Sequence, residues 1–335
     1  WLDVSKGQIT SALADVALRD VDARLGAKLE PLGFELLSGR VGASQHAQGF
    51  EFSTEGLQFR ATGGLQWPGG NLALVHTHPT RNASEITTLK ADRLDLATLT
   101  QIASRLPLDS GMQAMLASFA PQGLVETLDA RWQGPLDAPT AYTAKGRVAG
   151  LRVAALAAPV SAPGGRAAAT VEAVPGRPGV SGATVDFNVS QEGGQASVKI
   201  AKGALDLPGI FEDAKLQLDQ FSTEAKWKVA GQKIEVQLRD VKFANADAQG
   251  QAQVRWQTDD RVSSAPAAGS ASDHRFPGIL DLQGSLSRGD GSRVHRYLPL
   301  VLGADVRHYV RDAVVKGQVS DVKFKVKGPV DDLPF

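Results

Sequence analysis

Alternation of apolar and polar residues with a period of two recurs through most of this 335-residue sequence. Residues 183–189 alternate, and residues 196–200 alternate again after the turn Glu192-Gly193-Gly194-Gln195. Successive side chains on a strand point to opposite faces of a sheet, so the pattern predicts strands with one apolar and one polar face. Glycine provides the positive φ that a tight hairpin turn needs. The chain is therefore predicted to be mainly β, with an antiparallel sheet.

The same pattern predicts a second hairpin around Gly231-Gln232, between residues 227–229 and 234–238. Residues 241–243 also alternate, after which the apolar phase changes. The chain is expected either to turn or to bulge near residues 245–247.

Two regions have apolar residues at helical spacing instead. The first covers residues 94–120 and the second covers residues 294–316, with an expected break near Pro299. Residues 158–182 and 262–273 are rich in Gly, Pro, Ala or Ser and are expected to form long loops.

The helical regions belong to an internal repeat. Leu106-Pro107-Leu108 in the first copy corresponds to Leu298-Pro299-Leu300 in the second. Each copy continues with a strand bounded by two glycines, Gly123 and Gly134 in one and Gly317 and Gly328 in the other. Units that cannot bury their apolar faces alone are expected to stack along an axis.

This repeat predicts an elongated, curved β-groove with short helical insertions. Its first part is residues 1–138, with the insertion at about 94–120. Its second part is residues 139–335, with the insertion at about 294–316. The chain opens at Trp1 without Met and without a signal peptide, and we expect it to be a piece of a longer protein.

Charge and composition exclude several classes of protein. The 36 basic residues balance the 36 acidic ones, which argues against a nucleic-acid partner. The absence of cysteine excludes disulfides and thiolate chemistry. No stretch approaches the ~20 apolar residues that a membrane-spanning helix needs.

Candidates for chemistry are few. His76 and His78 have the spacing of two ligands on one strand face, but no third ligand is evident, so two exposed loop histidines are expected. Asp259-Asp260 and Asp331-Asp332 are expected in turns, because neighbouring residues on a strand point to opposite faces. No catalytic motif occurs. The sequence predicts no enzyme, no metal site and no cofactor.

Extended apolar surface is the remaining feature. It fits either a closed β-sandwich core or an open face kept for acyl chains, and alternation alone does not separate the two. The repeat favours the open face. Candidate lining residues are Val185, Phe187, Val198, Ile200, Trp227, Val229, Ile234, Val236, Leu238, Trp256, Leu280, Leu282, Phe324 and Val326.

At the punctuating positions of the repeat, and at some points between them, the sequence resembles the YhdP family of AsmA-like envelope proteins. The resemblance is carried by Tyr297 to Leu300, Arg307 to Val310, Val322 to Gly328, Leu207 to Phe211 and Ala244 to Gly250. It also includes Ala313, Gly317, residues 175–179 and Pro334-Phe335. It covers residues 90–335 well and the first ~90 residues only in texture.

The resemblance implies a periplasmic segment of a bridge-like phospholipid-transport protein. The parent protein would be anchored in the inner membrane of a Gram-negative bacterium and lead to the outer membrane. Its partners would be phospholipid acyl chains and, through other parts of the parent, both membranes. The alternative is a structural or partner-binding β-repeat scaffold without a lipid cargo. A carbohydrate-binding solenoid ranks last, because only 6% of residues are aromatic.

Overall fold

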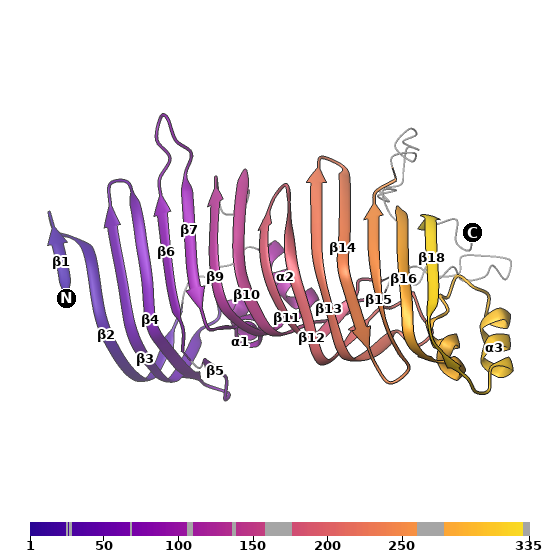
Figure 1. The fold of residues 1–335 in the computed structure, drawn as a ribbon. Helices are drawn as coiled ribbons and strands as arrows, with labels where there is room; N and C mark the ends of the chain where they lie inside the picture. Colours follow the sequence, from indigo (N-terminus) through magenta and orange to yellow (C-terminus); the bar gives the residue numbers. More distant parts are fainter. Residues whose placement is uncertain are drawn as a thin grey trace, which may run out of the picture. The chain divides into compact units, whose positions relative to one another are not determined.

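A computed structural model describes residues 1–24, 26, 29–67, 69–105, 110–135, 139–157, 176–259 and 278–330. These residues form an open antiparallel sheet of 18 strands with short helices between some of them (Figure 1). The mainly β fold class, the antiparallel sheet and the short helical insertions are thereby confirmed.

The chain divides into two compact units, which are described separately. Unit 1 comprises Trp1–Arg152 with Val185–Gln191, and unit 2 comprises Val153–Thr184 with Glu192–Phe335. Strand β11 contributes to both. These units describe packing rather than sequence repetition, so the predicted repeat boundary at 138/139 stays a prediction.

Unit 1 is a series of antiparallel strands, each paired with a neighbour close in sequence. The strands are β1 (Leu2–Ser5), β2 (Gln8–Ala23), β3 (Leu32–His46), β4 (Gly49–Ala61), β5 (Gln66–Trp67), β6 (Asn71–Thr77), β7 (Ile86–Asp92), β8 (Leu94–Asp95), β9 (Gln122–Gln133) and β10 (Ala141–Val153).

Unit 2 continues the same meander with long strands. The strands are β11 (Gly179–Ser190), β12 (Gly193–Asp206), β13 (Lys215–Ala230), β14 (Lys233–Ala244), β15 (Ala248–Gln257), β16 (Ile279–Asp290), β17 (Gln318–Val319) and β18 (Val322–Pro329).

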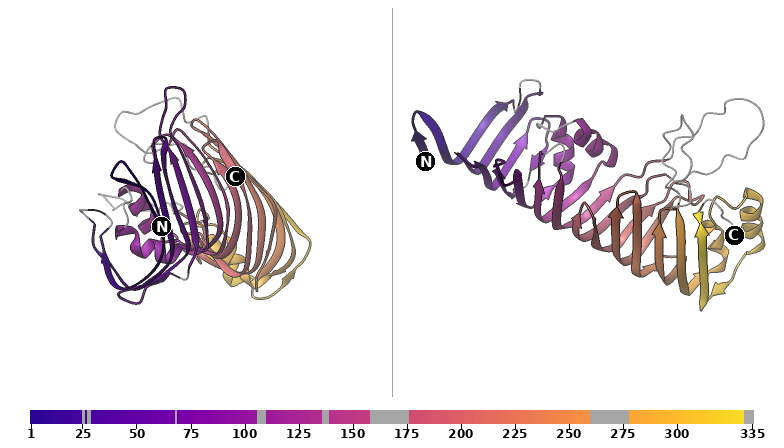
Figure 2. Two further views of the ribbon diagram at one scale, coloured as in Figure 1. Left: turned by 90° about the vertical axis from the view of Figure 1, so that its left-hand side faces the viewer. Right: turned by 90° about the horizontal axis from the view of Figure 1, so that it is seen from above.

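Helices form in both regions where apolar residues recur at helical spacing. In unit 1 they are α1 (Leu96–Ile102), the 3-10 turn η1 (Ala103–Arg105) and α2 (Ser110–Phe119), which lie together on one side of the strands (Figure 2). In unit 2 they are η3 (Gly291–Tyr297) and α3 (Ala304–Ala313). The predicted break near Pro299 is confirmed. Leu106-Pro107-Leu108 lies outside the described residues, so the repeated Leu-Pro-Leu element can be placed only at 298–300.

The predicted turns are confirmed with small shifts. Gly231 has φ +59 between β13 and β14, and Ala230 pairs with Lys233 across the two-residue loop. The turn before β12 lies at residues 191–192, one residue earlier than expected, because Gly193 and Gly194 already pair with β13. Residues 245–247 form a turn, in which Asn245 Oδ1 accepts hydrogen bonds from the backbone of Asp247 and Ala248.

Two of the predicted loops and both aspartate pairs fall mostly outside the described residues. The loop predicted for residues 158–182 ends earlier than expected, because β11 begins at Gly179. Residues 158–175, 262–273 and 331–332 are not among those described. Asp259 lies two residues after the end of β15 and is buried, at 7% exposure.

The strands of each unit end at two different edges. At the tip edge, short hairpin turns join β3 to β4, β11 to β12 and β13 to β14 (Figure 1). At the helix edge, the chain carries its helices and the connection from β12 to β13. We use these two names below for each unit taken by itself.

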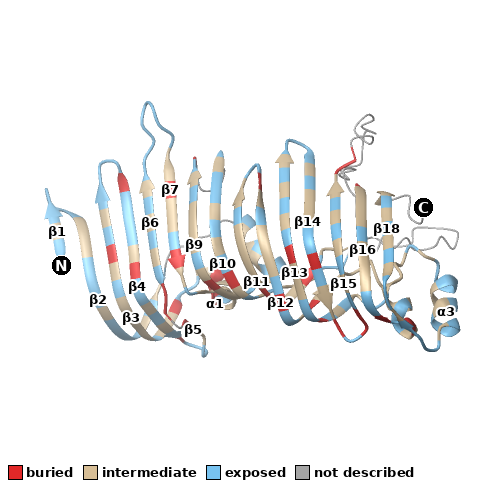
Figure 3. Cartoon of the chain, in the orientation of Figure 1, coloured by how far each residue is buried: buried red, intermediate tan, exposed pale blue. Residues whose placement is uncertain are grey.

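Burial is concentrated toward the helix edge. In unit 1, Leu32, Ala61 and Ile102 form a buried cluster, with Phe34, Phe59 and Leu65 packed against it. Thr98 of α1 donates a hydrogen bond to the Gln66 carbonyl and so holds α1 on the sheet. The buried apolar residues of the described chain lie in α1, in η1 or in the helix-edge half of their strands (Figure 3).

Candidate functional site: one apolar sheet face

Cross-strand register places the apolar residues of unit 2 on one face. Directly paired residues on neighbouring strands point to the same side, and residues two positions apart along a strand do too. Trp227 pairs with Val236, and Val236 pairs with Trp256. Further rows of the same face are Ala225, Leu238, Val254, Leu282 and Val326, then Ile200, Phe221, Phe243, Gly250, Leu286 and Val322.

The predicted lining residues therefore share faces as the alternation indicated. Those from Val198 to Val326 lie on the apolar face of unit 2, and all of them except the buried Ile200 are partly exposed. Val185 and Phe187 lie in the part of β11 that belongs to unit 1. Their neighbour Asp186 binds Arg147 on the polar side, so both point to the apolar side. Contact with lipid stays a prediction for the whole set.

Apart from Val185 and Phe187, the prediction named no residue of the apolar face of unit 1. One row across it consists of small and large apolar side chains only. Its members are Ala12, Ala43, Phe52, Leu74, Leu89, Ala130 and Ala144. The alternation in Phe50-Glu51-Phe52 was a usable signal, whereas the alanines gave none.

On the apolar faces of both units, aromatic rings lie over glycines of neighbouring strands. A Cβ added to Gly284 would overlap the ring of Phe324, and one added to Gly250 would lie 3.0 Å from the ring of Phe243. In unit 1 a Cβ on Gly146 would lie 3.1 Å from the ring of Phe187. Each ring thus occupies the space above a glycine, which keeps the face closely packed.

The opposite face is polar and carries most of the charge. In unit 1 several of its charges are paired: Arg40 contacts Asp15 at 2.8 Å, and Arg147 contacts Glu126 at 2.7 Å and Asp186 at 2.9 Å. The hydrogen bonds that Arg147 donates to Asp186 and Glu126 raise its pKa. The unit 2 rows are rich in lysine, as in Lys199, Ser222, Lys242, Gln251, Ser285 and Lys323.

Comparison with known protein families gives a match that covers the whole chain. The family model described as YhdP protein matches residues 1–335. The chain belongs to the YhdP family. This is an AsmA-like family of envelope proteins. Neither a curated protein nor a solved structure matches the chain. Among the described residues of this YhdP-family chain, no helix is long and apolar enough to cross a membrane.

Segments that carried the family resemblance meet at the helix edge of unit 2. The Asn245 amide donates to Tyr297 Oη at 2.8 Å, and Tyr297 Oη donates to Asp247 at 3.1 Å. Arg296 also contacts Asp247 and bonds Asp213 at 2.8 Å. Burial raises the pKa of Tyr297. This polar cluster fixes the end of η3 to the turn between β14 and β15.

A second contact holds the same insertion. Phe211 packs edge-on against Tyr297 with ring centroids 6.4 Å apart. The backbone of Leu300 donates to the Ile210 carbonyl at 2.9 Å. Three family segments distant in sequence, 207–211, 244–250 and 297–300, therefore join to hold the helical insertion of this YhdP-family chain.

The histidine pair differs from the prediction in one respect. His76 lies within β6 and is half-buried, so the expectation of a loop residue was wrong. Its Nδ1 is 2.9 Å from Thr87 Oγ1, and its ring stacks on Phe50 at 4.9 Å. His78 is exposed, as expected. No group of three or more potential ligands that would hold a metal occurs in the part of the chain that the structure describes.

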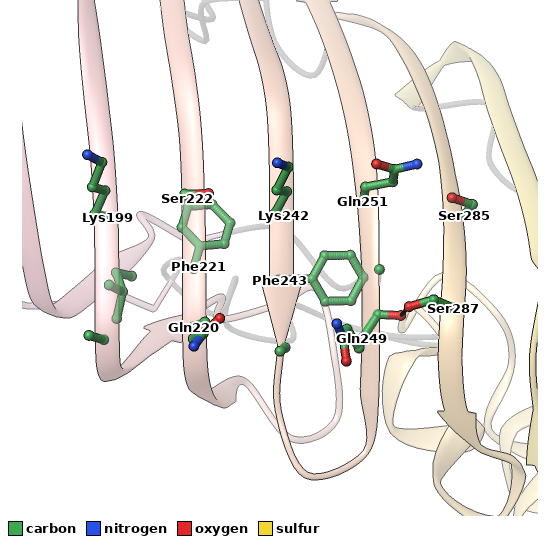
Figure 4. Close-up of a pocket in the computed structure, with 14 residues that line it drawn as sticks. Lys199, Gln220, Phe221, Ser222, Lys242, Phe243, Gln249, Gln251, Ser285 and Ser287 are labelled. Atoms are coloured by element: carbon green, nitrogen blue, oxygen red, sulfur yellow. Dashed lines mark hydrogen bonds between the residues drawn. The ribbon is translucent and has the colours of Figure 1, made fainter.

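One shallow depression of about 610 Å³ lies in unit 2 (Figure 4). Most of its lining side chains are polar and come from rows of the polar face, with aromatic residues of the next row between them. They are Lys199, Ile200, Ala201, Gln220, Phe221, Ser222, Lys242, Phe243, Ala244, Gln249, Gly250, Gln251, Ser285 and Ser287. This lining combines ammonium, amide and hydroxyl groups of the polar face with Ile200, Phe221 and Phe243 from one row of the apolar face.

Proposed function

We propose that this chain is a periplasmic segment of a phospholipid-transport protein and that its apolar face shields acyl chains between the inner and outer membranes. One observation carries the proposal: rows of apolar side chains continue from strand to strand on one face and remain partly exposed. In unit 2 the row containing Leu238, Val254 and Leu282 has no buried member. Exposed apolar area of this extent is typical of a binding surface.

The energetics favour such a face. Moving a sixteen-carbon chain from hydrocarbon into water costs on the order of 12 kcal/mol, at about 0.8 kcal/mol per CH₂. An apolar face offers the chain a non-aqueous surface along its whole length. Because apolar contact is non-directional, the face can accept many positions of one chain without favouring any of them.

The test introduces a charge on one face or the other of a single strand. Val236→Asp places a carboxylate on the apolar face, and Gln237→Asp places one on the polar face of the same strand. After purification, native mass spectrometry and lipid extraction should recover phospholipid with the Gln237→Asp chain and much less with the Val236→Asp chain. Phe324→Asp and Lys325→Asp form a second pair on β18.

Both variants of a pair must show the same β-sheet circular dichroism for the comparison to count. Absence of phospholipid from the unsubstituted chain would overturn the proposal. Equal phospholipid in all four variants would overturn it too, because the apolar face would then not be the binding surface.

A scaffold that binds a partner is the second candidate, and one observation favours it. Around α3, Val306 is 51% exposed and Tyr309 is 74% exposed, so this helix presents apolar surface to solvent. Under this alternative, Tyr309→Asp would impair the function in cells while phospholipid recovery stayed unchanged. Under the lipid proposal, Val236→Asp has the larger effect in both measurements.

A further inference from the structure

Exposure of the apolar face in unit 1 changes from one edge to the other. Toward the helix edge Leu32 is 2% exposed and Ala61 is 1% exposed, because Ile102 covers them. Toward the tip edge Phe50 is 38% exposed and Phe52 is 37% exposed. The protein's own side chains therefore cover the helix-edge half of the face more completely than the tip-edge half, although Thr87 in the tip-edge half is also buried, at 6% exposure.

The tip-edge half has two rows of different chemistry. The row nearest the tip edge, which we call the aromatic rim, consists of Phe50, His76, Thr87, Trp132 and Tyr142. The next row inward contains Phe52, Leu74 and Leu89 and has hydrocarbon side chains only. Two residues along a strand span roughly 7 Å, so the polarity of the face changes over that distance.

Indole, imidazole and phenol rings combine an apolar body with one polar atom or two. Trp and Tyr side chains gather where hydrocarbon meets hydrated head groups. In the aromatic rim, the bond between His76 Nδ1 and Thr87 and the stacking on Phe50 fix the imidazole. Tyr142 is 42% exposed at the end of the same row.

Unit 2 shows the same order independently. Trp227 and Trp256 lie in one row with Val236, close to the tip edge. Phe221 and Phe243 pair with each other close to the helix edge. On the strands of unit 2, the rings with an N–H thus lie toward the tip edge, and the hydrocarbon rings of Phe221 and Phe243 lie toward the helix edge.

We infer that glycerophospholipid lies on this face in one orientation, with its ester and glycerol level at the aromatic rim and its acyl chains directed toward the helix edge. The inference rests on the proposed function and adds which edge the head group faces.

Photo-crosslinking at defined rows tests this orientation. A benzoylphenylalanine replaces Tyr142 in the rim, Phe52 in the next row, or Val75 on the opposite face, where 37% exposure makes a matched control. The full chain is incubated with vesicles of palmitoyl-oleoyl phosphatidylethanolamine and phosphatidylglycerol, irradiated and analysed by tandem mass spectrometry. Leu74 replaces Phe52 if that variant loses its β-sheet circular dichroism.

Attachment from position 142 is expected near the ester groups, and attachment from position 52 further along the acyl chains, with little from position 75. Attachment from 142 at the same carbons as from 52, or deeper, would overturn the orientation and leave the proposed function standing. Lipid attached from neither 142 nor 52 would overturn the proposed function itself.

Discussion

The tip-edge half and the helix-edge half of unit 1 are built from the same strands, yet they differ in what covers them. Strand β4 runs through both: Phe52 is 37% exposed near the tip edge, and Ala61 is 1% exposed at the helix edge. Ile102 accounts for the difference, because the helix that carries it packs on only one end of the strands. Stability and surface can therefore be changed separately within one strand.

Truncation in the two halves should give the largest contrast. Leu32→Ala removes buried methyl groups and leaves a cavity, so we expect a loss of about 2–5 kcal/mol in the free energy of unfolding. Phe52→Ala should cost about 1 kcal/mol, since much of its ring is already exposed. Urea denaturation of both variants measures the difference. Equal losses would show that the tip-edge half is as closely packed as the other.

The polar cluster at the helix edge of unit 2 should give a smaller effect. Tyr297→Phe removes the bonds to Asn245 and Asp247, and we expect a loss of about 1–2 kcal/mol in the free energy of unfolding. Tyr309→Phe is the control, because Tyr309 is 74% exposed.

Tyr297 also makes the free energy of unfolding depend on pH. Burial raises the pKa of Tyr297 above its ordinary value of 10.0. The stability linked to this proton is fully present below pH 10 and is lost as the pH rises through the raised pKa. The difference between the unsubstituted chain and Tyr297→Phe should therefore shrink over the interval that begins at pH 10 and extends through the raised pKa. A difference that grew over this interval would contradict the assignment.

The exposed ion pair on the polar face of unit 1 should give the smallest effect. The Arg40 guanidinium donates hydrogen bonds to Asp15 and lowers the pKa of that carboxyl below 3.8. The contribution of this ion pair to the stability of the fold is present above pH 3.8 and is lost as the pH falls through the lowered pKa of Asp15. Asp15→Asn should lower the melting temperature slightly at pH 7 in low salt, and by progressively less as the pH falls below 3.8. A large shift that persists in high salt would show that the pair is not solvent-screened.

Much of the fold follows from the sequence because a two-residue period leaves few alternatives. Strand alternation, the Gly231 turn and the two helical regions were predicted from local signals. It was harder to predict which face the apolar residues occupy on either side of an irregularity in a strand. In β4, Phe52 and Phe59 have different spacing from a strict alternation, and the extra residues around Gly56, with φ +56, bring both to one face.

The same device operates in β14. Leu238 and Val241 are three positions apart, and the irregularity between them, where Asp240 has φ +50, keeps both on the apolar face. The predicted change of phase after Phe243 is thus a turn that follows an earlier bulge. A bulge depends on the partner strand as well as on its own residues, so the sequence of one strand does not locate it.

The candidate site was predictable where apolar side chains are large. The unit 2 set from Val198 to Val326 shares one face, as alternation indicated. The row of unit 1 that contains Ala43, Ala130 and Ala144 gave no signal, because alanine occurs on exposed faces as well as on buried ones. The half-buried position of His76 also depends on Phe50, which reaches it only through pairing of β4 with β6.

The rings that lie over Gly250 and Gly284 bear on how fast a bound chain would move. A surface with pockets and ridges gives a sliding molecule a series of traps, each of which must be escaped thermally. Phe243 and Phe324 occupy the spaces that the missing side chains would leave open. On the proposed function, these rings reduce the roughness of the path, so that one-dimensional diffusion across the face from strand to strand is slowed by few local minima. Glycine at these positions would then set a rate, whereas the apolar rows set an affinity.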